Sequence, residues 1–195
     1  MEILGKIENV DIRKIWHDEA RDFTPWLATP EGLAQLGEEL GEELELIGVE
    51  KKAGSYKADI VAKIVSQDDD NHIVVIENQL DTTDHDHLGK LITYASGHNA
   101  VTCVWIAYSY KEEHRQAIDW LNQHMTEVTF FAFEIEVIKI GNSSPAMRFK
   151  QISVPNQWSR AVRDTTTKVA SEKELGQLGF WQELKVLVRV KKEIT

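Results

Sequence analysis

The chain has 195 residues, of which 42% are hydrophobic and 28% charged, a composition typical of a globular protein with one sizeable core. Its formal net charge of −10 disfavours a protein that coats nucleic acid, because such proteins usually present a basic surface. The same charge is compatible with an acidic metal site beside a locally basic groove. No apolar run approaches the ~18 residues needed to span a bilayer. With no secretory signal pattern and a single cysteine, we expect a cytoplasmic protein without a membrane anchor.

Apolar periodicity predicts alternating helices and strands along most of the chain. Leu33, Leu36 and Leu40 repeat at spacings of three and four, which predicts an amphipathic helix that ends near Gly41. The run 73–76 is apolar throughout, as in a central strand covered on both faces. In chain order, the predicted elements are a helix over 30–41, strands over 43–51, 58–65 and 72–80, a helix from Thr83 to Gly97, a strand over 100–109, a helix over 111–125 and a strand over 128–141.

The order of these elements predicts a mixed α/β fold. Three consecutive strands joined by short turns favour antiparallel pairing, and the later strand–helix–strand unit favours a right-handed parallel crossover. Trp105 and Trp120 lie in apolar patterns and are predicted to be core residues. Trp26 and Trp158 are interpreted as anchors, with base stacking as the alternative. After about residue 156 the polar sequence predicts a linker and then a helix too short to form its own core.

Three polar residues interrupt two of the apolar strands. Asp59 starts the strand over 58–65, and Glu77 and Gln79 end the strand over 72–80. Glu77 and Gln79 are two residues apart, so their side chains leave the same face of the sheet. If the two strands pair around the polar loop between them, Asp59 lies near Glu77 or Gln79. Counting from a turn near Asp69 pairs Asp59 with about Gln79.

Buried carboxylates are costly unless they are paired or bind a cation. The residues alone leave two interpretations open for Asp59 and Glu77. Asp59 could end a turn while Glu77 forms a buried salt bridge with Lys57 or Lys90. Alternatively, the two carboxylates bind a hard divalent cation such as Mg²⁺ or Mn²⁺, which can lower the pKa of bound water and polarise a phosphodiester.

The spacing of these residues resembles a known motif. Asp59, then Glu77 eighteen residues later, then Gln79, is similar to the PD-(D/E)xK nuclease superfamily, whose fold is restriction-endonuclease-like. The longer string IENQLDTTDHDHLGKLITYASG (76–97) resembles an uncharacterised bacterial branch of that superfamily. The resemblance covers about residues 10–158. It implies an α/β core with a mixed central sheet flanked by helices, a nuclease-like domain over 1–155, and a truncated C-terminal domain that starts in 156–195.

The resemblance also implies roles for individual residues. Asp59 and Glu77 would hold the metal ion, joined by the backbone carbonyl of Asn78. The third motif residue is usually a lysine that orients or deprotonates the attacking water. Gln79 stands there in this chain, and glutamine cannot carry charge or act as a base. Some members use glutamine at this place, so the substitution bears on the proton transfer and not on the fold.

A fourth acidic residue is expected on the first helix of such a fold. Glu38 is the candidate in this chain, with Glu39 and Glu42 as alternatives. A solvated helix face explains the same residues without any catalytic role.

Substrate contacts are predicted on the helix after the active-site strand. Lys90 and Tyr94 are one turn apart and share a face, and we expect Lys90 to supply the positive charge missing at Gln79. Lys57 and His85 are further candidates for phosphate contacts. His85 and His87 point to nearly opposite sides of a helix, which excludes a shared zinc ion.

The sequence therefore predicts a Mg²⁺- or Mn²⁺-dependent nuclease-like protein that hydrolyses phosphodiester bonds of nucleic acid. The resemblance favours DNA as the substrate and is compatible with a homodimer. The alternative is a catalytically inactive nuclease-fold module that binds nucleic acid or protein. The glutamine and the net charge favour the inactive module. The two retained carboxylates favour the enzyme.

Overall fold

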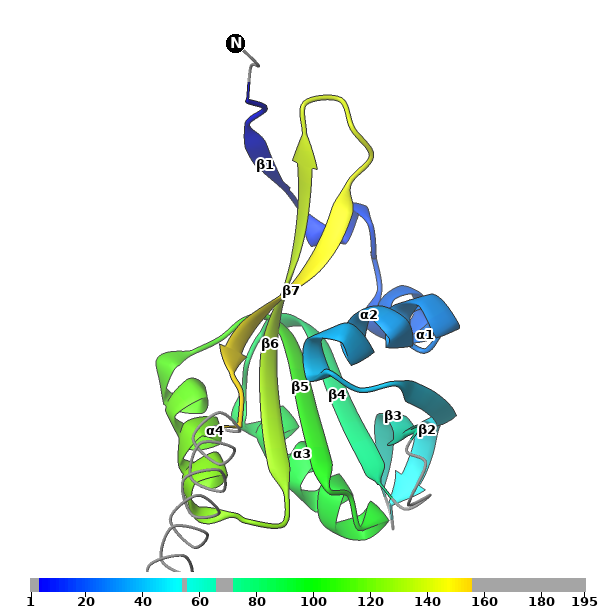
Figure 1. The fold of residues 1–195 in the computed structure, drawn as a ribbon, viewed down its shortest axis with the longest axis vertical. Helices are drawn as coiled ribbons and strands as arrows, with labels where there is room; N and C mark the ends of the chain where they lie inside the picture. The colour runs from blue at the N-terminus through cyan, green and yellow to red at the C-terminus, as the bar shows by residue number, and fades with distance from the viewer. Residues whose placement is uncertain (1–3, 54–55, 66–71, 156–195) are drawn as a thin grey trace, which may run out of the picture. The chain divides into compact units, whose positions relative to one another are not determined.

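The structure is a computed structural model that describes residues 4–53, 56–65 and 72–155 (Figure 1). The predicted linker and helix over 156–195 and the polar loop over 66–71 lie outside the described residues, as does Trp158. The elements, in chain order, are β1 (Ile7–Val10), η1 (Ile12–Lys14), η2 (Glu19–Phe23), α1 (Thr24–Leu27), α2 (Pro30–Leu40), β2 (Leu44–Ala53), β3 (Tyr56–Ile64), β4 (Ile73–Thr82), α3 (His85–His98), β5 (Thr102–Ser109), α4 (Glu112–His124), β6 (Thr129–Ile140) and β7 (Ala146–Ser153).

The seven strands form one curled mixed sheet with the order β1-β6-β5-β4-β3-β2, and β7 pairs with the other edge of β6 (Figure 1). The β2–β3 and β3–β4 pairs are antiparallel, and the β4–β5 and β5–β6 pairs are parallel. This confirms the predicted antiparallel start and parallel crossovers. The fold is therefore mixed α/β, with helices flanking the sheet.

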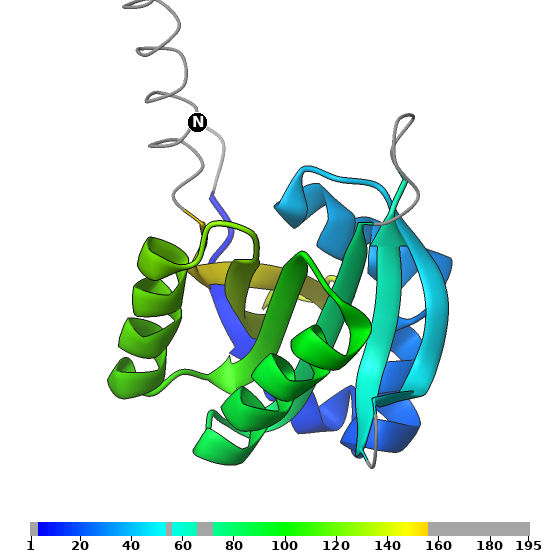
Figure 2. The same ribbon diagram turned by 90° about the horizontal axis from the view of Figure 1, so that it is seen from below.

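The two faces of the sheet carry separate halves of the core. One half joins the leucines of α2 to Ile60, Ile76 and Val104, and the other joins Leu91 of α3 to Trp105. Because strand residues alternate between faces, α1 and α2 cover one side and α3 and α4 cover the other (Figures 1 and 2). No helix in the described part of the chain combines the length and apolar character that crossing a bilayer requires.

Helix ends follow the predicted chemistry in most places. The Thr29 hydroxyl caps α2 by accepting a hydrogen bond from the Gly32 N–H, and Gly41 ends that helix at φ 71°, the left-handed conformation that glycine adopts without strain. Asp84 caps α3 in the same way. The predicted stop at Gly97 is wrong: α3 continues to His98, and Asn99 takes the left-handed position at φ 52°, which asparagine tolerates better than most residues.

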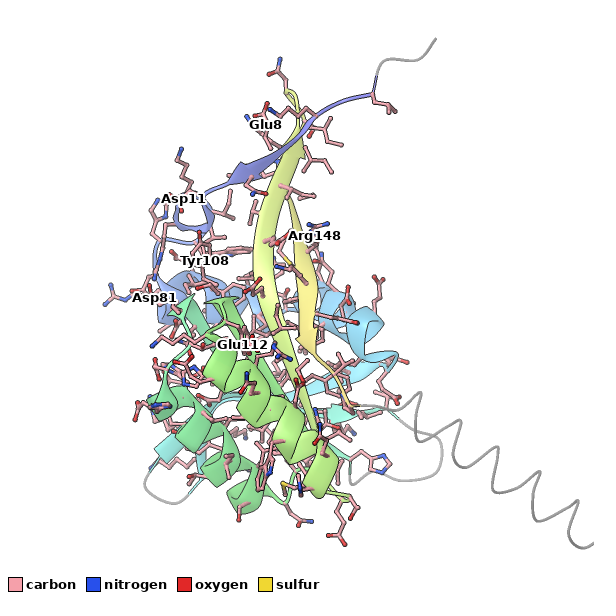
Figure 3. The ribbon with its side chains drawn as sticks, turned by 90° about the vertical axis from the view of Figure 1, so that its left-hand side faces the viewer. Glu8, Asp11, Asp81, Tyr108, Glu112 and Arg148 are labelled. Atoms are coloured by element: carbon pink, nitrogen blue, oxygen red, sulfur yellow. The ribbon has the colours of Figure 1, made fainter. Side chains whose placement is uncertain are left out.

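Two strands and one surface residue differ from the sequence-based predictions. β1 and β7 flank the long strand β6, and Glu8 and Arg148 mark them in Figure 3. Half of the residues in each strand are apolar, but neither strand contains the long regular pattern from which a strand is predicted. Trp105 is fully buried as predicted, but Trp120 is 57% exposed and stacks on His124. The prediction of Trp120 as core is wrong because it lies on the outer side of the amphipathic helix α4.

Candidate metal centre

β3 and β4 separate at Asp59 and Glu77. Their antiparallel ladder ends with Ile60 opposite Ile76, so one further step places Asp59 opposite Glu77. Beyond the ladder, side chains replace the backbone partners. The Asn78 N–H donates to Oδ2 of Asp59 at 2.9 Å, and the Asp59 N–H donates to Oε1 of Glu77 at 3.2 Å. Each carboxylate thus accepts a hydrogen bond from a backbone N–H of the opposite strand, which interlocks the pair.

This register refines the sequence-based expectation. Asp59 does lie beside Glu77, but the count that paired Asp59 with about Gln79 is wrong by two positions. The count assumed a symmetric turn near Asp69, and apolar alternation alone does not encode the length of a hairpin connection. The outcome is that two carboxylates, not a carboxylate and an amide, face each other.

Burial raises the pKa values of both carboxyl groups, and the charge of Asp59 adds to the shift at Glu77. Only 1% of Glu77 is exposed. Burial, followed by the charge of Asp59, raises the pKa of Glu77 to about 9, against the lowering effect of the Asp59 N–H. Burial also raises the pKa of Asp59, opposed by the Asn78 N–H and by the charges of His87 and Lys90. The pair is therefore an electrostatically unfavourable arrangement that a cation would relieve.

Glu19 is a third carboxylate at this place, and sequence reasoning missed it. Its Oε2 accepts a hydrogen bond from the Leu80 N–H at 2.8 Å. Burial raises the pKa of Glu19, and the charge of Asp59 adds to the shift. The one local signal is Asp18, which caps the π-helical turn η2, and a cap predicts a helical turn and not a site.

Beyond the point where β3 separates from β4, the N-terminal segment supplies hydrogen-bond partners for the edge of β4. Arg13 donates to the Leu80 carbonyl at 3.0 Å and to the Asp81 carboxylate at 2.9 Å. The Leu80 N–H and C=O are thus both satisfied by side chains of the N-terminal segment. In an extended strand one residue points its N–H and C=O the same way, so the Asn78 carbonyl points toward the same gap as the Asp59 carboxylate.

Gln79 makes a full set of hydrogen bonds within the protein. It is 2% exposed. Its amide nitrogen donates to the Thr82 carbonyl at 2.9 Å and to the Asp84 carboxylate at 3.2 Å, and its oxygen accepts from the Trp105 indole at 3.0 Å. The residue therefore ties β4 to β5 and to the capping residue of α3. It has the chemistry of a structural amide and not of a group that orients water.

Positive charge reaches the carboxylates from α3. Lys90 interacts electrostatically with both Asp59 and Glu77, and it forms an ion pair with Asp86 at 2.8 Å. Lys90 and Tyr94 line a cavity of about 250 Å³. The charge of Glu77 contributes, after burial, to a raised pKa of Tyr94. The structure thus brings Lys90 and Tyr94 to the same site as the two carboxylates.

Histidines of the same helix have other partners. The charge of His87 acts on Asp59, but the His87 ring lies 2.9 Å from the Asp84 carboxylate. Nδ1 of His85 lies 2.9 Å from Nε2 of the buried His114, whose other ring nitrogen contacts Thr83 at 2.8 Å. His85 and His87 therefore serve different networks, in agreement with their helical spacing.

Two other predicted residues lie in different surroundings. Lys57 is exposed and pairs with Glu50 at 2.7 Å, and the charge of Glu50 in turn acts on Asp59. Glu38 is on α2, where it lines a separate groove with Glu31. Glu19, and not Glu38, is the acidic residue of the N-terminal helical segments that lies beside Asp59.

The donor set fits a hard divalent cation. Mg²⁺ is commonly bound through one or two carboxylates and keeps several water ligands, and Asp59, Glu77 and the Asn78 carbonyl supply oxygen atoms of that kind. Within the described ranges, no three or more His, Cys, Asp or Glu side chains are grouped so that they could hold a metal ion by themselves. Water or substrate oxygens would therefore have to complete the coordination. A soft metal does not fit, because Asp59, Glu77 and the Asn78 carbonyl offer oxygen atoms and neither a thiolate nor an imidazole.

Comparison with known proteins adds no relative: the chain matches no protein-family model, no curated protein and no solved structure.

Proposed function

We propose that this chain is a PD-(D/E)xK-type protein with a restriction-endonuclease-like core, which hydrolyses phosphodiester bonds of nucleic acid with Mg²⁺ or Mn²⁺. The observation that carries the proposal is the interlocked pair of Asp59 and Glu77 at the point where β3 leaves β4. Two adjoining carboxylates whose pKa values are raised by desolvation have no structural advantage over apolar residues. A bound divalent cation would offset the charge of the two carboxylates and so account for their arrangement.

The residues at the site have separable roles. Asp59, Glu77 and the Asn78 carbonyl would hold the cation, which would lower the pKa of bound water and polarise the phosphodiester. Lys90 lies on the helix beside them and supplies positive charge for a phosphate. Glu19 holds the edge of β4 in place. The sequence resemblance favours DNA over RNA as the substrate. A homodimer would allow both strands of DNA to be cut.

A non-cleaving module is the second candidate function, and Gln79 is the observation that favours it. Its amide is committed to Trp105, Thr82 and Asp84, so the position that usually orients water is occupied by a structural bond network. In this alternative the same fold would bind nucleic acid, with the cation bridging to phosphate and no hydrolysis.

Calorimetric titration with Mg²⁺ and Mn²⁺, paired with a plasmid-nicking assay in Mn²⁺, distinguishes these functions. We expect wild type to bind one cation, and Asp59→Asn with Glu77→Gln to lose at least about tenfold in affinity. Glu113→Gln with Glu127→Gln is the matched control, because both residues are exposed and distant in sequence from the site. Equal binding by the site variant and wild type would refute the metal centre. Binding without nicking would establish the non-cleaving module.

Lys90→Ala tests the source of positive charge. We expect nicking to fall by about a hundredfold or more, since a charge at the phosphate contributes several kcal/mol to such reactions, while metal binding and circular dichroism stay unchanged. Lys139→Ala, which breaks an ion pair with Glu8, is the control for general loss of charge. Undiminished nicking by Lys90→Ala would remove this residue from the reaction.

A further inference from the structure

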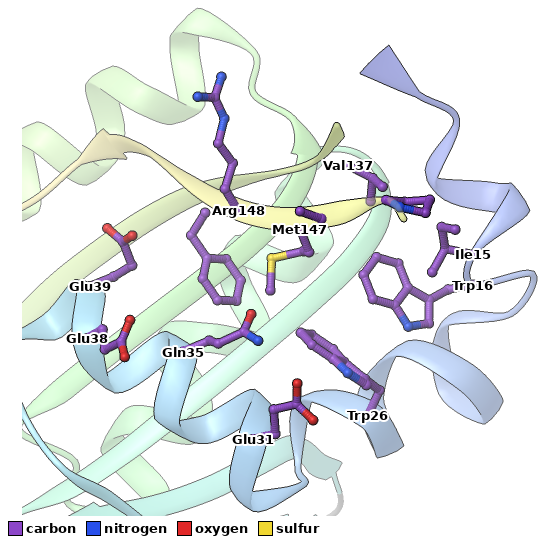
Figure 4. Close-up of a pocket in the computed structure, with 13 residues that line it drawn as sticks. Ile15, Trp16, Trp26, Glu31, Gln35, Glu38, Glu39, Val137, Met147 and Arg148 are labelled. Atoms are coloured by element: carbon purple, nitrogen blue, oxygen red, sulfur yellow. The ribbon is translucent and has the colours of Figure 1, made fainter. Parts of the chain in front are cut away.

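A second concave site lies between α2 and β7, separate from the carboxylate pair. It is a groove of about 520 Å³ (Figure 4), a size within the range of ligand-binding sites. Residues 145–149 line it consecutively. A strand that contributes consecutive residues presents its edge as well as one face. Among the strands that the structure describes, β7 pairs with β6 alone.

The floor of the groove is aromatic and apolar. Trp16 and Trp26 meet there with ring centroids 5.0 Å apart and planes inclined by 49°, and Met147 faces them from β7 (Figure 4). Trp16 is only 6% exposed, so the partly buried Trp26 supplies the indole face that attracts a cation, and tryptophan is the strongest of the aromatic residues in this role. The thioether of Met147 adapts to varied apolar groups.

The wall of the groove is acidic. Glu31, Gln35 and Glu38 are spaced by one turn along α2 (Figure 4), so Glu31 and Glu38 lie about 10 Å apart along the helix axis. Arg148 also lines the groove, but its guanidinium pairs with Glu136 at 2.6 Å and extends away from α2 in Figure 4. The charge that the groove offers to a ligand is therefore negative.

We propose that this groove binds an extended, basic peptide segment of another protein. The edge of β7 supplies backbone hydrogen bonds, as in other recognition by strand addition. Arginine or lysine side chains extend over the indole ring of Trp26, and their charged ends meet Glu31 and Glu38. The groove is distinct from the metal centre, since its main wall is α2 and the residues flanking Asp59 and Glu77 come from η2, β3, β4 and α3. The proposal does not depend on nuclease activity.

The test uses the full chain and a capped hexapeptide that alternates valine and arginine. An isosteric peptide with citrulline in place of arginine is the neutral control. We expect the arginine peptide to bind, with affinity that falls as salt rises from about 50 to 300 mM. The Kd is expected to rise by about fivefold or more in Glu31→Gln with Glu38→Gln, and by less than about twofold in the control Glu113→Gln with Glu127→Gln.

Trp26→Leu separates the aromatic floor from the acidic wall. We expect it to weaken the arginine peptide by about threefold or more through loss of the cation–π contact, while circular dichroism confirms the fold. Equal binding of the citrulline peptide, or equal loss in both pairs of glutamate variants, would overturn the proposal. Equally tight binding of free arginine or tetramethylammonium would assign the groove to a small organic cation and would also overturn it.

Discussion

At Glu77 the proposed metal binding and the stability of the fold place the most directly opposed demands on one side chain. It is buried in the sheet beside a second carboxylate, and its pKa is raised to about 9. The carboxyl group therefore favours folding in its protonated form. Its contribution is complete below the ordinary pKa of 4.5 and is lost as the pH rises to about 9. Between pH 4.5 and about 9, folding of the metal-free protein requires this group to take up a proton, which lowers the stability of the folded state.

Replacing this carboxyl group with an amide is consequently expected to stabilise the protein. In EDTA at pH 8, Glu77→Gln gains about 1–2 kcal/mol, or roughly 3–6 °C in Tm. Mg²⁺ raises the Tm of wild type and leaves that of Glu77→Gln unchanged. Differential scanning calorimetry of both proteins, with Glu113→Gln as the control, provides the measurement. A lower Tm for Glu77→Gln in EDTA would show that the ionised carboxylate stabilises the fold.

Gln79 is the residue whose chemistry the motif alone misrepresents. Its position marks it as a catalytic group, whereas its three hydrogen bonds mark it as a connection between β4, β5 and α3. Buried polar groups that lose their partners cost about 1–3 kcal/mol each.

Gln79→Leu is therefore expected to lower the free energy of unfolding by about 2–4 kcal/mol, because it leaves the Trp105 indole and the Thr82 carbonyl without this partner. Urea denaturation followed by tryptophan fluorescence measures the loss. Gln116→Leu, an exposed change on α4, serves as the control. If Gln79→Leu were as stable as wild type, the bond network would carry no structural weight and a direct role at the metal would regain support.

Among the elements, α3 connects two parts of the proposed site. Its cap, Asp84, binds Gln79, and its residue Lys90 acts on the carboxylate pair. Asp84 accepts hydrogen bonds from the His87 N–H and ring and from Gln79. These bonds outweigh the effect of desolvation, the largest single influence, and lower the pKa of Asp84 to about 2. The same helix carries Lys90 nearly two turns after Asp84, so the orientation of the helix sets where the positive charge lies.

Removing this cap tests that link. Asp84→Ala is expected to cost about 1 kcal/mol, a modest value because the side chain is 44% exposed and solvent screens its charge. The carboxylate contributes fully above its unfolded pKa of 3.8, and the contribution is lost as the pH falls toward about 2. Asp84→Asn keeps a capping oxygen and loses the charge, so it is expected to be intermediate at pH 7. Chemical denaturation at pH 7 and pH 3 gives both numbers. An equal loss at the two pH values would contradict the ionic part of the explanation.

For the whole molecule, the raised pKa values of Asp59 and Glu77 would make the proposed metal binding depend on pH. A cation has to displace the proton of Glu77, whose pKa is about 9, so apparent affinity rises with pH and approaches its limit near that value. Between pH 6 and 8 we expect the Kd for Mg²⁺ to fall by about tenfold per pH unit. Calorimetry in two buffers of different ionisation enthalpy counts the protons released. A Kd independent of pH would mean that Glu77 is already ionised or does not bind the metal.

Much of this fold follows from local patterns. Leucine spacing located α2, continuous apolar runs located β4 and β5, and the strand order implied antiparallel pairs followed by parallel ones. Each pattern reflects burial, and burial is readable wherever an element faces the core with a regular period. The Asp59 and Glu77 carboxylates stood out for the same reason, because charge within an apolar strand is rare.

Tertiary structure decided the features that no period encodes. The register that sets Asp59 opposite Glu77 depends on the hairpin connection, and the arrival of Glu19 depends on an irregular N-terminal segment that folds back along β4. Gln79 became structural only because Trp105 and Asp84 approach it from other elements. The sequence by itself determined that the apolar runs of β4 and β5 are buried and that Asp59 and Glu77 place charge among apolar strand residues. Only the packing of separate elements decided which of those groups face one another, because contacts between residues far apart in sequence depend on backbone geometry that local patterns do not specify.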